Sequence, residues 1–115
     1  MSYYPILLDL SGKTALVAGG GNVARRKIER LLEHGAEVRV VSRELTDRVK
    51  ELVDSGRLRY LGGDYTEACL EGAFVVIAAT DDPTINQQVW AEARALGLLV
   101  NVVDDPEHCN FIAPS

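Results

Sequence analysis

The stretch Val17-Ala-Gly-Gly-Gly-Asn-Val-Ala24 decides the fold. It overlaps the end of a short apolar run at residues 14–18, and it opens a segment at residues 22–34 whose apolar side chains recur every three or four positions. The run is typical of a buried β-strand, and the recurrence is typical of an amphipathic helix. The three glycines therefore mark a tight connection between a first strand and a first helix.

The rest of the chain continues this alternation. Further strands are predicted at residues 37–42, 58–61, 74–78 and 98–103, further helices at residues 45–53 and 83–96, and one helical turn at residues 66–70. Pro83 directly after Asp82 is typical of a helix start. Connections that contain a helix allow neighbouring strands to pair in parallel. The sequence therefore predicts an α/β fold, a Rossmann-like doubly wound parallel sheet of about five strands with helices on both faces.

Length and composition narrow the class of protein. A chain of 115 residues with 47% hydrophobic residues predicts a single domain over residues 1–115. Its net charge of −5 argues against general binding to nucleic acid or anionic membranes. No apolar run approaches the roughly 20 residues needed to span a bilayer, and the N-terminus does not resemble a signal peptide. Cys69 and Cys109 show no metal or redox spacing, so we expect a reduced, cytoplasmic protein.

The glycine stretch has the form G-x-G-x-x-A, with Gly19, Gly21 and Ala24 at the marked positions. Between a strand and a helix, this form is the fingerprint of dinucleotide binding, although alone it also fits a turn without a ligand. Gly19 allows the turn, and Gly21 lets a diphosphate approach the backbone at the positive end of the helix. The residues predicted to bind the cofactor here are Gly19, Gly20, Gly21, Asn22 and Val23.

The end of the second strand is the usual place for an acidic residue that binds the adenosine ribose. This chain has Ser42, Arg43 and Glu44 there, and all three are predicted to bind the cofactor. Glu44 can accept a hydrogen bond from a ribose 2′-hydroxyl, whereas Arg43 can pair with a 2′-phosphate. Spacing alone therefore does not distinguish NAD from NADP.

Ligands of open parallel sheets bind beyond the carboxyl ends of the strands. The segment after the fourth strand is therefore predicted to face the nicotinamide half of the cofactor. The candidate contacts are Ala79, Thr80, Asp81 and Asn86, while Asp82 is expected to cap the helix that begins at Pro83.

The fifth strand ends in two adjacent carboxylates, Asp104 and Asp105, before Pro106. One is expected to cap or turn the chain, which leaves the other to act as a general base or to bind a cation. Asp104 is the better candidate because it lies nearer the end of the strand. Asn101, in the same strand, is predicted to contact the substrate.

Arg25, Arg26 and Lys27 lie in the first turns of the first helix, where cations oppose the helix dipole at a cost of about 0.3–1 kcal/mol each. Two interpretations remain open. One or more of these side chains face an anionic ligand, or they form a solvated charged face paired with Glu29, Glu33 or neighbouring residues.

Three segments, "ALVAGGGNVARRK", "IAATDDPTINQQV" and "NVVDDPEHCNFIAPS", together resemble the precorrin-2 dehydrogenase / sirohydrochlorin ferrochelatase family, the N-terminal domain type of sirohaem synthase. The resemblance covers nearly the whole chain in the expected order. It implies an oxidoreductase of sirohaem and porphyrin biosynthesis that transfers hydride from precorrin-2, a tetrapyrrole with eight carboxylates, to NAD. In some relatives the same protein then inserts ferrous iron.

The resemblance also implies roles for single residues. It assigns the key carboxylate of both activities to Asp104, which would be the metal ligand only in a ferrochelatase. It places the dinucleotide on Asn22, Val23, Arg43 and Glu44, and it favours NAD. A substrate with eight carboxylates needs cations, which the residues of the basic turn, Arg25, Arg26 and Lys27, can supply.

Relatives of this family continue beyond "FIAPS" into a dimerisation segment and a helical tail. We therefore expect residues 1–115 to lack part of the substrate pocket, and dimer formation by this chain is left open. The alternative function is a regulatory domain that senses a dinucleotide without catalysis.

Overall fold

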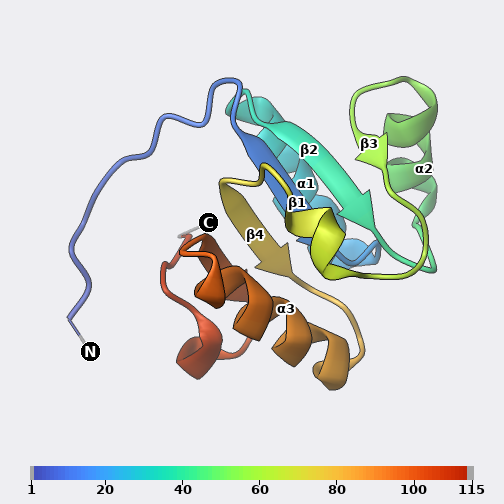
Figure 1. Cartoon of the computed structure of the whole chain (residues 1–115). Coiled ribbons are helices and arrows are strands. Elements are labelled where there is room, and N and C mark those ends of the chain that lie inside the picture. The colour runs from blue at the N-terminus through green and yellow to red at the C-terminus, as the bar shows by residue number, and fades with distance from the viewer. Residues whose placement is uncertain (1, 114–115) are drawn as a thin grey trace.

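The computed structural model describes residues 2–113. Five strands form one sheet: β1 (Thr14–Ala18), β2 (Glu37–Val41), β3 (Arg59–Tyr60), β4 (Val75–Ala78) and β5 (Leu99–Val102). The helices are α1 (Asn22–Glu33), α2 (Asp47–Asp54) and α3 (Pro83–Ala95), with short 3₁₀ helices η1 (Glu67–Leu70) and η2 (Pro106–His108). Figure 1 shows the strands in the middle of the molecule and the N-terminal segment extending away from it.

All neighbouring strands pair in parallel, in the order β3-β2-β1-β4-β5. The chain runs outward from β1 to β3 and then returns to the other side of β1 for β4. The connections after β1 and β4 therefore leave the sheet in opposite directions, which opens a crevice at their carboxyl ends. This arrangement confirms the predicted doubly wound sheet.

The core lies on both faces of the sheet because side chains alternate along each strand. Val17 packs with Ile28 of α1 and Leu52 of α2 on one face. Leu16 packs with Val89 of α3 and with Leu70 on the other face. These residues are almost completely buried, so each helix is fixed against the sheet, and the loops at the strand ends take defined positions.

Most elements end within one or two residues of the predicted bounds, and three differences are noteworthy. Helix α2 begins at Asp47 rather than at residue 45, because the Thr46 hydroxyl accepts a hydrogen bond from Val49 N (3.3 Å) and caps the helix. The edge strand β3 pairs over only two residues. The short helix η2 was not predicted. Within residues 2–113, no helix combines the length and apolar composition that crossing a bilayer requires.

Candidate functional site

A cleft of about 670 Å³ lies at the carboxyl ends of β1, β2, β4 and β5. This volume is within the range of ligand pockets in proteins, which is about 300–1,000 Å³. Every residue predicted to bind the cofactor lines the cleft, as does the predicted catalytic residue: Gly19, Gly20, Gly21, Asn22, Val23, Ser42, Arg43, Glu44, Ala79, Thr80, Asp81, Asn86 and Asp104. The sheet thus brings together residues from four separate loops.

The three positions of the first loop hold glycine for different structural reasons. Gly19 has φ +131°, and a Cβ there would lie 2.4 Å from the carbonyl oxygen of Ala79. A Cβ at Gly20 would lie 2.3 Å from the carbonyl oxygen of Glu44. Both glycines therefore let the loops around the cleft pack backbone against backbone. A Cβ at Gly21 would meet no protein atom within 4 Å, so the protein itself does not require glycine at this position.

The first turn of α1 fits an anionic group. Gly21 is its N-cap and offers no side-chain hydrogen bond, and no acidic residue lies in the turn. The free N–H groups and the positive end of the helix dipole are therefore not neutralised by a local carboxylate. Together with the open space above Gly21, this geometry fits the diphosphate of a dinucleotide.

At the end of β2, two of the three predicted contacts are engaged within the protein. The Ser42 hydroxyl donates to the carbonyl oxygen of Glu44 (2.7 Å), and Arg43 donates from Nε (3.1 Å) and Nη2 (3.0 Å) to Oδ1 of Asp64. Within residues 2–113, the exposed carboxylate of Glu44 has no hydrogen-bond partner. Glu44 is therefore the acceptor that this edge of the cleft offers to a ligand hydroxyl.

The loop after β4 is held by Asn86 of α3. Its Oδ1 accepts from the backbone N–H (3.2 Å) and the hydroxyl (2.7 Å) of Thr80, and its Nδ2 donates to the Thr80 carbonyl (3.1 Å). Asp82 caps α3 as predicted, accepting from Thr84 N (2.9 Å). Because both the oxygen and the nitrogen of the Asn86 amide bond to Thr80, Asn86 positions this wall of the cleft. The neighbouring Asp81 is exposed.

The two carboxylates after β5 have separate surroundings. Asp105 Oδ2 lies 2.8 Å from Nδ1 of His108 and accepts from Nε2 of Gln87 (3.2 Å). Asp104 lines the cleft, is exposed and has φ +61°. Within residues 2–113, no hydrogen bond engages its carboxylate. Asp105 therefore secures the turn, and Asp104 presents a free carboxylate to the ligand space.

Residues 6–115 match the NAD_binding_7 family, described as "Putative NAD(P)-binding". The chain belongs to this NAD(P)-binding family. The match agrees with the glycine loop and confirms the prediction of a nicotinamide dinucleotide cofactor.

Siroheme synthases are among the similar proteins. The chain is 46% identical over 115 residues to the siroheme synthase of Photorhabdus laumondii and 44% identical to that of Nitrosococcus oceani. Each match covers all of this chain but only 24% and 25% of those proteins, so the chain spans about a quarter of their length. The solved structure of "SirC, precorrin-2 dehydrogenase" matches with a TM-score of 0.86 and 31% identity, over 98% of this chain and 55% of that one. The resemblance stated from the sequence is confirmed.

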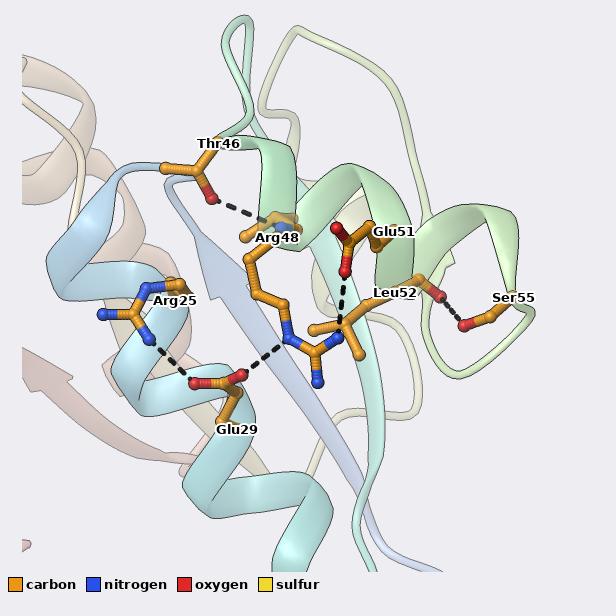
Figure 2. Close-up of polar contacts among 8 residues, drawn as sticks. Arg25, Glu29, Thr46, Arg48, Glu51, Leu52 and Ser55 are labelled. Carbon is orange, nitrogen blue, oxygen red and sulfur yellow. Dashed lines mark hydrogen bonds and ion pairs between the residues drawn. The ribbon is translucent and has the colours of Figure 1, made fainter.

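The basic turn of this NAD(P)-binding domain lies outside the cleft. Arg25 donates to Glu29 (2.9 Å), which also accepts from Arg48 of α2 (2.9 Å), and Arg48 in turn contacts Glu51 (3.1 Å). Figure 2 shows this network joining α1 to α2. The hydrogen bond from Arg48 is the main reason that the pKa of Glu29 is lowered. Of the two interpretations, the paired charged face therefore describes Arg25.

Three other predicted substrate contacts also lie outside the cleft lining. Lys27 lines a separate apolar groove of about 260 Å³ beside the N-terminal segment, and Arg26 is exposed on α1. The side chain of Asn101 donates to the carbonyl oxygen of Phe111 (3.0 Å) and holds the segment after η2 against β5. The structure does not bring Arg26, Lys27 or Asn101 together at one site.

The sequence did not indicate the surroundings of two ring side chains, Tyr65 and His108. Tyr65 lines the cleft, and its buried hydroxyl has no hydrogen-bond partner within residues 2–113. Burial is the main reason that its pKa is raised. His108 contacts Asp105 and packs edge-on against Trp90. Only the strand order and the turn into η2 place these residues, so spacing offered no signal.

Proposed function

We propose that this chain is the NAD-dependent dehydrogenase domain that oxidises precorrin-2 to sirohydrochlorin in sirohaem biosynthesis. The observation that carries the proposal is the free carboxylate of Asp104 at the mouth of a dinucleotide cleft. The likeness to SirC, precorrin-2 dehydrogenase, and to siroheme synthases supplies the substrate class.

In the proposed complex, the diphosphate lies over Gly21 at the first turn of α1. Glu44 accepts hydrogen bonds from the adenosine ribose, and the backbone of Ala79 and Thr80 borders the nicotinamide half, held in place by Asn86. When bound, NAD accepts the hydride that the substrate loses.

Asp104 is proposed as the general base. Oxidation of precorrin-2 removes one hydride and one proton, so a base must take the proton as the hydride leaves. Within residues 2–113, no hydrogen bond engages the oxygens of the Asp104 carboxylate, so they are free to accept this proton. Its position beside the loop after β4 is the place where substrate and nicotinamide ring would meet.

Substrate binding and iron insertion are further proposals. Arg26 and Lys27 have no ion-pair partner within residues 2–113, so they remain candidates for the carboxylates of a bound tetrapyrrole. If ferrous iron is a second substrate, Asp104 is the proposed ligand. The described residues hold no group of three metal-binding side chains, so the tetrapyrrole nitrogens would complete the coordination. We also propose a cytoplasmic location, in keeping with the two free cysteines. A homodimer is proposed only for the full-length proteins of the resembled family, and dimer formation by residues 1–115 stays open.

The test is an anaerobic assay with NAD and precorrin-2 that follows sirohydrochlorin by its absorbance. It is run with residues 1–115 and with the same chain joined to the downstream segment of the Photorhabdus laumondii siroheme synthase. Sirohydrochlorin formation that requires NAD is the expected result. A chain that binds NAD but forms no sirohydrochlorin in either form would instead be a dinucleotide sensor, and the enzyme proposal would be wrong.

A further inference from the structure

The end of β2 carries residue types that commonly bind the 2′-phosphate of NADP. A serine hydroxyl and an arginine guanidinium lie side by side at positions 42 and 43, directly after the strand. An arginine at this place can accommodate a 2′-phosphate in a dinucleotide fold. On residue types alone, this edge of the cleft would therefore accept NADP.

The structure shows the guanidinium of Arg43 turned to a neighbouring loop. Its Nε and Nη2 donate to the same oxygen, Oδ1 of Asp64 (3.1 and 3.0 Å). Asp64 lies between Gly63 and Tyr65, which both line the cleft. A Cβ at Gly63 would lie 3.3 Å from Cγ of Arg43, so the glycine leaves the space that the arginine stem occupies. The loop after β3 thus receives the Arg43 side chain.

The other polar groups at this edge also disfavour a phosphate. The Ser42 hydroxyl donates its hydrogen to the carbonyl of Glu44. The exposed Glu44 carboxylate next to it can accept from the hydroxyls of an unphosphorylated ribose and repels a 2′-phosphate. Arg43 is engaged by Asp64, and the Ser42 hydroxyl by the Glu44 carbonyl. Of these side chains, only the Glu44 carboxylate, an acceptor, is therefore free to contact the ribose.

We infer that Asp64 is a specificity-determining residue that favours NAD over NADP by engaging Arg43. The inference rests on dinucleotide binding in the proposed function. Asp64 acts by holding the guanidinium that would otherwise pair with the 2′-phosphate. Both side chains are largely exposed, at 79% and 78%, so solvent weakens the pair and the effect is modest. Removal of the Asp64 charge is expected to strengthen NADP binding by about three- to tenfold.

The experiment measures the Kd of NAD and of NADP by calorimetry on residues 1–115. The variants are Asp64→Asn, Arg43→Gln and the double variant. Asp54→Asn, at the last residue of α2, is the matched control for loss of one negative charge. We expect Asp64→Asn to bind NADP three- to tenfold more tightly than the wild type, with NAD binding unchanged within about twofold. Asp54→Asn and the double variant should not show this gain.

The outcomes separate the inference from the proposed function. If the wild type binds NAD and Asp64→Asn leaves the ratio of the two Kd values unchanged, Asp64 has no role in specificity. If the gain persists in the double variant, the engagement of Arg43 is not its cause, and the inference is overturned. If the wild type binds neither dinucleotide, the proposed function itself is wrong.

Discussion

Asp104 and Asp105 are neighbours in the chain, yet only Asp105 is held by other side chains, with its Oδ2 2.8 Å from Nδ1 of His108. Asp104 adopts the left-handed backbone conformation, with φ +61°. This conformation is uncommon for a non-glycine residue and costs free energy of about 1 kcal/mol or more. The contacts of Asp105 to His108 and Gln87 hold the turn that imposes it. One aspartate therefore secures the geometry that directs the other to the cleft.

Replacement of Asp104 by asparagine is predicted to separate binding from catalysis. Asparagine tolerates the left-handed conformation and keeps the size of the side chain, but it cannot take a proton. We expect dehydrogenation of precorrin-2 to fall by about 10²-fold or more, with the Kd of NAD unchanged within about twofold. Paired activity and calorimetry measurements check this. Equal losses of activity and affinity would show that Asp104 acts through folding or cofactor binding.

His108 is predicted to position Asp104 through Asp105. His108→Ala removes the partner of Asp105, and we expect kcat to fall by about tenfold while the Kd of NAD is kept. In His108→Asn, the side-chain amide can donate in place of Nδ1, so most of kcat should return. The measurement compares kcat and KM for the two variants. Equal losses of kcat in both variants would contradict a role for the hydrogen bond to Asp105.

The Glu29 network should make stability depend on pH. Because the hydrogen bond from Arg48 lowers the pKa of Glu29, the contribution of this pairing is present above its ordinary value of 4.5. It is lost as the pH falls through the lowered value. We expect Glu29→Gln to have a lower Tm than the wild type at pH 7, by a small amount typical of exposed ion pairs, and the difference should shrink by pH 3. A Tm difference that is the same at both pH values would contradict the assignment.

Gly19→Ala is predicted to destabilise the fold itself. Its φ of +131° is unfavourable for alanine, and the new Cβ would clash with the Ala79 carbonyl at 2.4 Å. The backbone conformation alone should cost about 1–3 kcal/mol in the free energy of unfolding. Urea unfolding with and without NAD measures this cost. An unfolding free energy equal to that of the wild type would mean that the first loop is not packed as described.

The positions of the cleft residues could be predicted because they follow from strand order and strand ends. Parallel strands bring their carboxyl ends to one edge, so the glycine loop, Ser42–Glu44, Ala79–Asp81 and Asp104 had to meet there. Local residue chemistry also sufficed for the Asp82 cap. No contact between distant side chains was needed for these predictions.

The residues that were placed differently depend on side-chain contacts that spacing does not show. Arg25 is held by Glu29, whose second partner, Arg48, comes from another helix. The Asn101 side chain donates a hydrogen bond to the Phe111 carbonyl. Phe111 reaches it after a turn through the short helix η2, which was not predicted. In each case, a polar residue near the expected site found a partner within the protein.

The most direct test of the central claim is the affinity of Gly21→Val for NAD. A Cβ at Gly21 would meet no protein atom within 4 Å, so we expect the variant to fold with a Tm close to that of the wild type. The valine side chain would occupy the space proposed for the diphosphate. We predict at least about a hundredfold loss of NAD affinity, equivalent to about 2.8 kcal/mol, in calorimetric titrations of the folded variant. A folded Gly21→Val protein that binds NAD as tightly as the wild type would contradict the account.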